Sequence, residues 1–286
     1  MKIVKTVAEL SGQLASYRKE NRKIGFVPTM GALHQGHLSL VKEAASQADV
    51  VVASVFVNPN QFNNADDLKR YPRDLSKDAA MLEAVKCELL FAPDVNEVYP
   101  EEDKRVFDFG SLETVMEGKY RPGHFNGVAQ VVSRLFDMVK PDKAFFGLKD
   151  FQQLAVIQNL VQQLNLKVEI VPCAIIREDD GLAMSSRNAL LTEEQRKNAP
   201  EIARTLFDSC NFVPELTIEA LKKKVHDEIN KSSELEVEYF EIVDGYTLQA
   251  VDNWTDSNYI VGCIAVFANK IRLIDNVTYK NKDHEY

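Results

Sequence analysis

A strand-like segment, a turn rich in glycine and histidine, and a helical pattern follow one another near the N-terminus. The strand-like segment is Lys23–Val27, the turn is Pro28–His37 with the sequence PTMGALHQGH, and the helical pattern begins near Leu38. A strand that leads directly into a helix is the opening unit of an α/β fold. At such a turn the backbone N–H groups and the positive end of the helix favour an anion such as a nucleotide phosphate, and glycines let the backbone approach it. Histidines there can donate hydrogen bonds to a phosphate and stabilise the charge that builds when phosphorus is attacked.

The same alternation continues through the first half of the chain. Val50–Val57 is apolar on both faces, which is typical of a parallel strand covered by helices on each side. The pattern predicts an α/β domain over residues 1–177, with a Rossmann-like doubly wound parallel sheet whose ligands bind beyond the carboxyl ends of the strands. Its expected strands are Ile24–Pro28, Asp49–Val57, Glu88–Ala92, Lys143–Gly147 and Val168–Pro172, and its expected helices are Val7–Tyr17, Leu38–Ala48, Leu75–Val85, Phe125–Val139 and Phe151–Leu164.

The pattern changes after Arg177, and residues 178–286 are expected to form a second, smaller α+β domain. Thr192 and Gln195 read as a capping box that opens a helix. Further along, the sequence predicts a helix over Ile218–Ile229, antiparallel strands at Glu236–Val243, Tyr259–Ala268 and Ile271–Asn276, and a mobile polar tail at Lys280–Tyr286.

Composition limits the partners. The formal net charge of −9 at pH 7 argues against broad binding to nucleic acid or to an anionic membrane, since both require many negative charges to be neutralised. The four cysteines lack metal-ligand or redox spacing and are expected to be buried thiols. No N-terminal segment resembles a signal peptide, and the best apolar run is too short to span a bilayer, so we expect a cytoplasmic protein.

Polar motifs fall at the ends of several predicted strands. Asn58–Gln61 follows the second strand, Gly147–Asp150 follows the fourth, and Asp180–Asn188 begins the second domain with two hydroxyls, an arginine and several backbone N–H groups. The last run suits a polyphosphate. Neither a Walker G-x-x-x-x-G-K-[ST] motif nor the G-x-G-x-x-G of dinucleotide-binding proteins occurs.

Six motifs in order resemble the pantoate–β-alanine ligase family, the pantothenate synthetases of the H-x-G-H nucleotidyltransferase superfamily. They are PTMGALHQGH, VNPNQF, YPRD, RPGHFNGV, FFGLKDFQQ and DGLAMSSRN, and the resemblance runs from about residue 1 to 275. It implies an ATP- and Mg²⁺-dependent ligase that condenses (R)-pantoate with β-alanine to pantothenate through a pantoyl adenylate, with release of AMP and pyrophosphate. It also implies a homodimer and a C-terminal domain that acts as a lid.

The resemblance further implies which residues bind the reactants. His34 and His37 would contact the ATP phosphates, with His37 as proton donor; Lys149 would neutralise charge on the transferring phosphate; Ser185, Ser186 and Arg187 would hold the β- and γ-phosphates. The remaining implied ATP contacts are Met30, Gly31, Ala32, Leu33, Gln35, Gly36, Gly147, Leu148, Asp150, Ile176 and Met184. The implied substrate contacts are Gln61 for pantoate and β-alanine, Gln153 for pantoate, and Asn58, Arg121 and His124. Leu148 departs from the family, where a charged or polar residue often stands between the glycine and the lysine. The sequence identifies no ligands for Mg²⁺.

Three other functions compete with this one. A nucleotidylyltransferase of the same superfamily would need basic residues for a phosphorylated acceptor, whereas the two glutamines favour an uncharged polyol-like acid. A catalytically silent nucleotide-binding regulator would lack His37, Lys149 or the Ser-Ser-Arg run, and all are present. A scaffold protein would not need so many polar motifs at strand ends.

Overall fold

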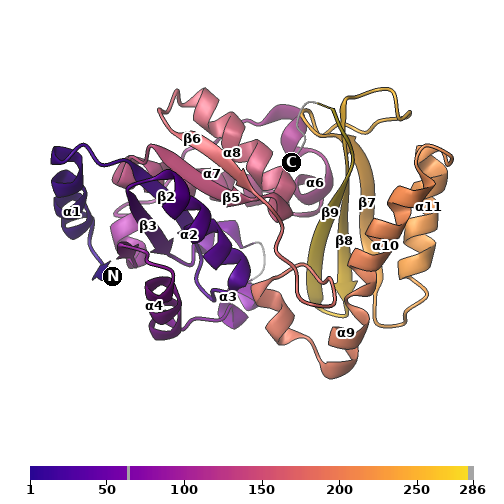
Figure 1. The fold of residues 1–286 in the computed structure, drawn as a ribbon, viewed down its shortest axis with the longest axis horizontal. Coiled ribbons are helices and arrows are strands. Elements are labelled where there is room, and N and C mark those ends of the chain that lie inside the picture. Colours follow the sequence, from indigo (N-terminus) through magenta and orange to yellow (C-terminus); the bar gives the residue numbers. More distant parts are fainter. Residues whose placement is uncertain (63–64, 283–286) are drawn as a thin grey trace. The chain divides into compact units, whose positions relative to one another are not determined.

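The chain folds as two compact units in the computed structural model, which describes residues 1–62 and 65–282 (Figure 1). The first unit comprises residues 1–109, 121–148 and 156–174, and the second comprises residues 110–120, 149–155 and 175–286. Within the described part of the chain, no helix has both the length and the apolar character needed to cross a membrane.

A six-stranded parallel sheet forms the centre of the first unit, in the order β1-β4-β3-β2-β5-β6. This arrangement confirms the predicted doubly wound parallel sheet. The strands are β1 (Lys2–Val4), β2 (Ile24–Thr29), β3 (Val50–Val55), β4 (Leu89–Phe91), β5 (Lys143–Gly147) and β6 (Glu169–Cys173). The helices of this part of the chain are α1 (Val7–Lys19), α2 (Gln35–Gln47), α3 (Ala65–Arg70), α4 (Leu75–Ala84), α5 (Val95–Val98), α7 (His124–Val139) and α8 (Phe151–Gln163).

Both faces of the sheet are buried because its strands carry apolar residues on both sides. Val27 and Val51 belong to a core cluster that also contains residues of α2 and α4. On a neighbouring position of β2, Phe26 meets Phe136 of α7 edge to face, with ring centroids 6.3 Å apart. Burial on both faces explains why these strands read as continuous apolar runs rather than as alternating ones.

Several boundaries differ from the prediction. The edge strand β1 was not predicted, since three residues are too few to give a periodic signal, and it pairs with β4 in register from Lys2 opposite Leu89. β3 ends at Val55, two residues early, and α2 begins at Gln35, three residues early. The early start of α2 arises because His34 caps the helix with its side chain.

Strand order places the predicted motifs at one edge of the first unit. β2 lies between β3 and β5, and all three strands are parallel, so their carboxyl ends lie side by side. The strand that follows β2 in the chain, β3, lies on one side of β2, and β5 lies on its other side. This is a topological switch point, where open α/β sheets bind their ligands. The turns that follow these strands contain Met30–His37, Asn58–Gln61, and Gly147 with Leu148.

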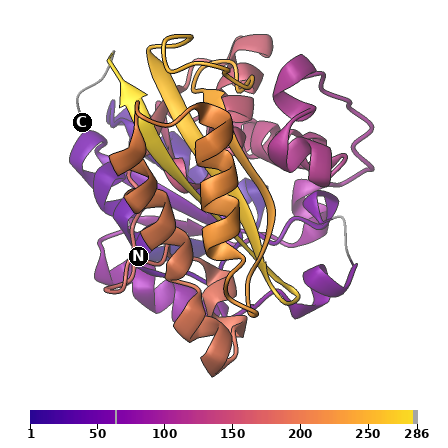
Figure 2. The same cartoon turned by 90° about the vertical axis from the view of Figure 1, so that its right-hand side faces the viewer.

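The second unit contains the predicted antiparallel strands, β7 (Glu236–Asp244), β8 (Tyr259–Ala268) and β9 (Ile271–Asn281). Two helices, α10 (Glu201–Ser209) and α11 (Ile218–Ile229), lie across one face of this sheet (Figure 2). The capping box at Thr192 opens α9 (Glu193–Asn198), as predicted. The tail prediction was wrong at its start, because β9 continues through Lys280 to Asn281; residues 283–286 lie outside the described residues.

A buried ionic cluster joins residues 110–120 to the strands of the second unit. This segment carries the short helix α6 (Met116–Tyr120). Arg272 of β9 donates to both carboxylate oxygens of Glu117 at 2.6 and 2.8 Å, and the Tyr239 hydroxyl donates to the same carboxylate at 2.8 Å. Arg272 also donates to Glu238 at 2.6 Å. Glu117 and Tyr239 are buried, so each depends on these partners for its polar atoms.

Candidate functional site

A buried carboxylate holds the turn between β2 and α2. Asp78 of α4 accepts hydrogen bonds from the backbone N–H groups of Ala32 at 3.0 Å and Leu33 at 2.8 Å. Gly31 and Ala32 both have positive φ values, of 80° and 51°. A Cβ atom at Gly31 would lie 2.8 Å from an oxygen of Asp78, so the turn requires glycine there. Burial raises the pKa of the Asp78 carboxyl above its ordinary value, against the opposing effect of the two N–H donors.

The two histidines of the turn cap α2 reciprocally. Nδ1 of His34 accepts from the N–H of Gly36 at 3.1 Å, and Nδ1 of His37 accepts from the N–H of His34 at 3.3 Å. The rings lie 4.1 Å apart between centroids. Because both Nδ1 atoms accept, the neutral rings carry their protons on Nε2. The pair therefore combines a structural cap with two Nε2–H donors at a helix N-terminus, an arrangement suited to phosphate oxygens.

Two amides at the end of β3 orient each other. Asn58 precedes the short helix η1 (Pro59–Gln61) and is fully buried. Its Nδ2 donates to the carbonyl of Gly127 at 3.0 Å and to Oε1 of Gln61 at 3.2 Å. The Nε2 of Gln61 lies 3.0 Å from the sulfur of Met30. The structure thus brings Met30, Asn58 and Gln61, all predicted site residues, into one hydrogen-bonded set.

His124 holds the backbone of the same segment. It begins α7 and is buried, and its Nδ1 lies 2.9 Å from the carbonyl oxygen of Gln61. A carbonyl oxygen only accepts, so His124 donates from Nδ1. Arg121 lies in the turn that leads into α7, where its carbonyl accepts from the N–H of His124 at 3.0 Å. The predicted residues Arg121 and His124 therefore support the position of Gln61.

In the second unit, Lys149 is held through its backbone. It lies in the short helix η3 (Leu148–Asp150) and is half-buried, while Asp150 is exposed. The carbonyl of Lys149 accepts from Nδ2 of Asn276 at 3.1 Å. The neighbour Asp275 forms a two-pronged ion pair with Arg177, at 2.6 and 2.9 Å.

That ion pair also fixes the loop that carries the Ser-Ser-Arg run. Arg177 pairs with Ala183 in an isolated bridge and donates to the carbonyl of Gly181 at 3.1 Å. The N–H of Met184 donates to the carbonyl of Ile176 at 3.0 Å, so these two predicted nucleotide contacts lie side by side. The run itself folds into the short helix η4 (Ser186–Leu190), for which Ser185 is the N-cap and accepts from the N–H of Arg187 at 3.2 Å.

Gln153 lies on α8 next to Gln152, whose side chain binds backbone groups of residues 112–117. Gln152 is buried and binds the carbonyls of Leu112 and Val115 and the N–H of Glu117, at 2.6 to 2.9 Å. Gln153 itself is half-buried. Adjacent residues of one helix point in different directions, so the identical side chains at 152 and 153 have separate surroundings.

Each unit therefore presents groups that suit an anionic ligand. The first has the histidine pair at the start of α2 and the amide of Gln61; the second has Lys149, the hydroxyls of Ser185 and Ser186, and Arg187. Within residues 1–62 and 65–282, no group of three His, Cys, Asp or Glu side chains is arranged to hold a metal ion.

Sequence reasoning missed the supporting residues Asp78 and Asn276. Asp78 stands four residues before the buried Leu82 on α4, so it occupies a core-facing position where an apolar residue is expected. That mismatch could have identified it. Asn276 follows the buried Asp275 on β9, and these two polar residues interrupt the apolar residues Leu273, Ile274 and Val277, which is a comparable signal.

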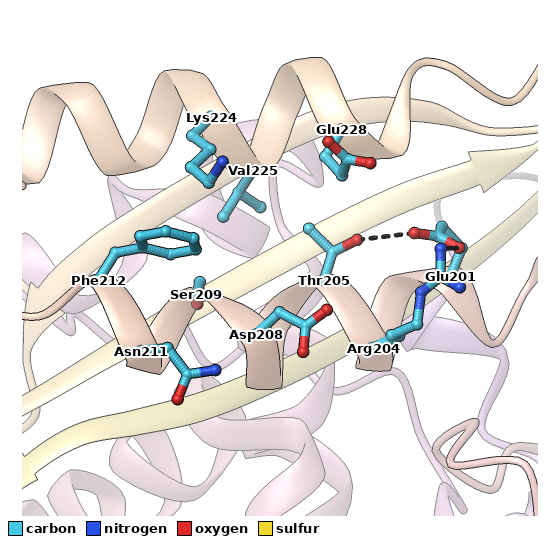
Figure 3. Close-up of a pocket in the computed structure, with 10 residues that line it drawn as sticks. All are labelled: Glu201, Arg204, Thr205, Asp208, Ser209, Asn211, Phe212, Lys224, Val225 and Glu228. Carbon is cyan, nitrogen blue, oxygen red and sulfur yellow. Dashed lines mark hydrogen bonds and ion pairs between the residues drawn. The ribbon is translucent and has the colours of Figure 1, made fainter.

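A hollow of about 390 Å³ lies between α10 and α11 in the second unit (Figure 3). None of the predicted site residues lines it. Its charges are mixed, with Glu201 and Arg204 on α10 and Lys224 and Glu228 on α11, and the Lys224 ammonium lies 4.5 Å from the centre of the Phe212 ring. Glu201 pairs with Arg204 and Thr205, and acidic and basic groups lie side by side, so the hollow gives no single-sign surface for the anionic reactants considered above.

Comparisons with known proteins place nearly the whole chain in one family. Residues 2–278 match the sequence profile described as pantoate-beta-alanine ligase. Pantothenate synthetases from Porphyromonas gingivalis and Bacteroides fragilis are 57% and 54% identical to this chain, over 98% of its length and 99–100% of theirs.

Solved structures of the same family are also similar to this chain. The pantothenate synthetase of Thermus thermophilus is 43% identical with a TM-score of 0.92, over 98% of this chain and 100% of that one. The pantoate-beta-alanine ligase of Francisella tularensis, complexed with beta-gamma ATP and beta-alanine, is 35% identical with a TM-score of 0.82, over 98% of both chains.

Proposed function

This chain belongs to the pantoate–β-alanine ligase family, and on that premise we propose how its own residues carry out the reaction. It is a ligase that forms pantothenate from pantoate and β-alanine. In the route we propose, a carboxylate oxygen of (R)-pantoate attacks the α-phosphorus of ATP, and the bond from that phosphorus to the bridging oxygen breaks to release pyrophosphate. The amine of β-alanine then attacks the acyl carbon of the pantoyl adenylate, loses a proton and displaces AMP. No covalent enzyme intermediate is needed, so the side chains serve to position reactants and to neutralise charge.

The phosphates of ATP bind first to the turn that begins α2 in this proposal. His34 and His37 donate from Nε2, and His37 is the proton donor. Met30, Gly31, Ala32, Leu33, Gln35 and Gly36 contact the nucleotide along the turn. The support is the tautomer set by the capping bonds on both Nδ1 atoms, which makes Nε2 the N–H donor of each ring.

Cationic and hydroxyl groups of the second unit complete the proposed phosphate contacts. Lys149 neutralises charge on the transferring phosphate, and Ser185, Ser186 and Arg187 bind the β- and γ-phosphates. The nucleoside contacts are Gly147, Leu148, Asp150, Ile176 and Met184. The backbone hydrogen bond from Met184 to Ile176, which brings these two residues together, supports this assignment.

Neutral amides recognise pantoate in this proposal. Gln61 binds pantoate and β-alanine, Gln153 binds pantoate, and Asn58, Arg121 and His124 contribute to the same recognition. An amide can bond a carboxylate without holding it in an ion pair, so the carboxylate remains nucleophilic. The hydrogen bonds around Gln61 support its role.

We also propose that Mg²⁺ accompanies ATP. Mg²⁺ is commonly held by substrate phosphates and water with only one or two carboxylates, so the phosphates themselves can supply most of its ligands. The donor set of the described residues fits this mode, since it offers no all-protein cage. Bound there, the ion would reduce the negative charge that opposes attack on phosphorus.

A cytoplasmic homodimer remains a proposal, as does the division into a catalytic domain over 1–177 and a lid over 178–286. Sedimentation at several concentrations tests the dimer. Limited proteolysis with and without ATP plus pantoate tests the lid, and identical cleavage patterns would count against it.

The single observation that carries the proposal is the histidine-capped turn at the switch point of the sheet. The test is product analysis after the protein is mixed with Mg-ATP, D-pantoate and β-alanine. We expect AMP and pyrophosphate only when pantoate is present, and pantothenate once β-alanine is added. Nucleotide transfer to another acceptor would favour a nucleotidylyltransferase, and nucleotide binding without turnover would favour a silent regulator.

Variants test the residue roles separately. His37→Ala and Lys149→Ala should each lower turnover by about 10²–10³-fold, as expected for the loss of one transition-state donor. Near-normal rates in both would contradict the assigned roles. Gln153→Ala should chiefly raise the KM for pantoate, and an unchanged KM would refute that contact.

A further inference from the structure

Asn58 is a buried amide with every polar atom in use. Its Nδ2 donates to the carbonyl of Gly127 and to Gln61, and its Oδ1 accepts from the N–H of Asn60 at 3.3 Å and from the hydroxyl of Tyr99 at 2.9 Å. The carbonyl of Gly127 can only accept, so the Nδ2 side of Asn58 is fixed and the Tyr99 hydroxyl must donate.

Tyr99 lies outside the six motifs and reaches Asn58 from another element. It is the C-cap residue that follows α5, and its ring lies 5.1 Å from the guanidinium of Arg134 and 6.2 Å from the ring of Phe56. Arg134 in turn donates to the buried carboxylate of Asp103 at 2.6 Å. These contacts hold the phenol in one orientation, with its hydroxyl directed to Asn58.

The orientation of Asn58 determines the orientation of the Gln61 amide. Because Nδ2 of Asn58 donates to Oε1 of Gln61, the Nε2 of Gln61 must face the opposite way, where Met30 lies 3.0 Å from it. Gln61 therefore presents N–H donors on the side of the H-x-G-H turn. A substrate that contacts this edge must offer an acceptor oxygen, such as a carboxylate or hydroxyl oxygen.

We infer that Tyr99 is a positioning residue for pantoate: through Asn58 it helps to hold the amide of Gln61 in place, with its donors toward the substrate. This rests on the proposed contact between Gln61 and pantoate. Without the hydroxyl, Oδ1 of Asn58 retains only the longer bond from Asn60. The carbonyl of Gly127 still sets which way the amide faces, but Asn58, and through it Gln61, is held in place less firmly.

Tyr99→Phe removes the hydroxyl while keeping the ring. We expect the KM for pantoate to rise about 3–10-fold, as for the loss of one hydrogen bond, with kcat and the KM for ATP within about twofold of the wild type. Tyr279→Phe is the matched control. It removes a partly buried hydroxyl that lies 2.6 Å from the hydroxyl of Ser209 in the second unit, so it should lower thermal stability to a similar degree and leave the KM for pantoate unchanged. An unchanged pantoate KM in Tyr99→Phe, or an equal rise in the KM for ATP, would overturn the inference.

A double-mutant cycle distinguishes positioning from general destabilisation. In a Gln61→Ala background, Tyr99→Phe should cause no further loss of kcat/KM for pantoate, because the residue through which it acts is gone. Additive losses would show that Tyr99 acts by another route.

Gln61→Glu tests the amide orientation even if Tyr99→Phe does not fold. An acceptor in place of the donor should raise the pantoate KM further than Gln61→Ala does, and an equal or smaller rise would overturn the orientation. The wild-type assay separates this inference from the proposed function. Wild-type protein without pantoate-dependent AMP release defeats the function, whereas active wild type with unaffected variants defeats only the inference.

Discussion

At the scale of single residues, the site is held by groups that also serve the fold. The imidazoles of His34 and His37 cap α2 with Nδ1 and keep a proton on Nε2. Structural and functional explanations for a histidine pair at a helix start are usually treated as alternatives. In the proposed site, Nδ1 of each ring serves the cap and Nε2 serves the phosphates.

This division can be tested at His34. His34→Ala should lose both the cap, at about 1 kcal/mol of stability, and most of the turnover. His34→Asn should keep stability near that of the wild type, since asparagine is a favoured N-cap residue, and still lose turnover because its amide is shorter than the imidazole. Chemical denaturation and kcat for both variants check the prediction, and full turnover in His34→Asn would contradict it.

Asp78 offers a second test at this scale. Asp78→Asn replaces one acceptor oxygen with an N–H₂ group that faces a backbone N–H, so we expect a loss of about 1–3 kcal/mol and a raised KM for ATP. Asp74→Asn on the same helix is the control. Asp74 caps α4 by accepting from Lys77, a role that asparagine fills equally well, so neither quantity should change. An ATP KM unaffected in Asp78→Asn would show that the turn does not depend on the carboxylate.

The sequence pointed to the candidate site residues, whose contacts with the reactants are proposed above, but not to the residues that support them. The H-x-G-H, Gln61 and Ser-Ser-Arg segments could be selected because they are local strings, the first two of them following predicted strands. Asp78, Tyr99 and Asn276 act across 45, 41 and 127 residues of chain, respectively. No local pattern encodes such pairings, because they depend on tertiary packing.

At the scale of elements, α7 and η1 approach so closely that only glycine fits between them. A Cβ atom on Gly127 would lie 2.2 Å from the carbonyl oxygen of Asn60. This approach is what brings the Gly127 carbonyl to Asn58.

Gly127→Ala should therefore separate the two elements. We expect a loss of about 1–3 kcal/mol from overpacking and a raised pantoate KM, because Asn58 and Gln61 move together. Gly12→Ala in α1 is the opposite case, since nothing lies within 4 Å of its Cβ position. It should stabilise the protein by about 0.5–1 kcal/mol through helix propensity, with kinetics unchanged. If alanine is tolerated at Gly127 as well as at Gly12, the close approach of α7 to η1 is not required.

Long periodic elements were predicted well and short ones poorly. The helices α4, α7, α8 and α11 agree with the prediction to within a residue or two because their apolar periodicity is strong. The three-residue β1 and the short helices α5 and α6 were missed, since a pattern needs several turns or residues to repeat. α10 is a different case: it is amphipathic, but it follows α9 with only two residues between them, so the two read as one stretch.

At the scale of the whole molecule, stability should depend on pH through buried carboxylates. The bonds from Arg105 and Arg134 hold the pKa of Asp103 well below its ordinary range. A lowered pKa stabilises the folded state fully above the unfolded-state value, about 3.9, and this contribution is lost as the pH falls below it.

We expect Asp103→Asn to lose about 1.5–3 kcal/mol at pH 7, with the difference from wild type shrinking below about pH 4. Asp227→Asn, which breaks an exposed pair with Lys223, should have little effect at either pH. Denaturation midpoints between pH 3 and 7 give the comparison. A difference that stays constant over this range would exclude titration of Asp103 as its cause.

The packing of residues 110–120 against strands beyond residue 177 supplies a test of the proposed domain boundary at that residue. Glu117 is buried against Arg272 and Tyr239, which a chain ending at residue 177 would lack. The uncompensated carboxylate should then draw residues 110–120 into solvent. We expect faster proteolysis within this segment than in the full chain, measured by mass spectrometry of the fragments. Equal protection would support an independent domain over 1–177.

The ion pair between Glu117 and Arg272 also has a consequence for biosynthesis. The two residues are separated by 155 positions, so at about 5–20 residues per second the ribosome makes Arg272 about 8–30 s after Glu117. During that interval the parallel sheet of the first unit can form, while residues 110–120 wait outside it with a charged side chain that keeps them in water. Because a lone carboxylate is costly to bury, we expect residues 110–120 to become buried only after their arginine has been made.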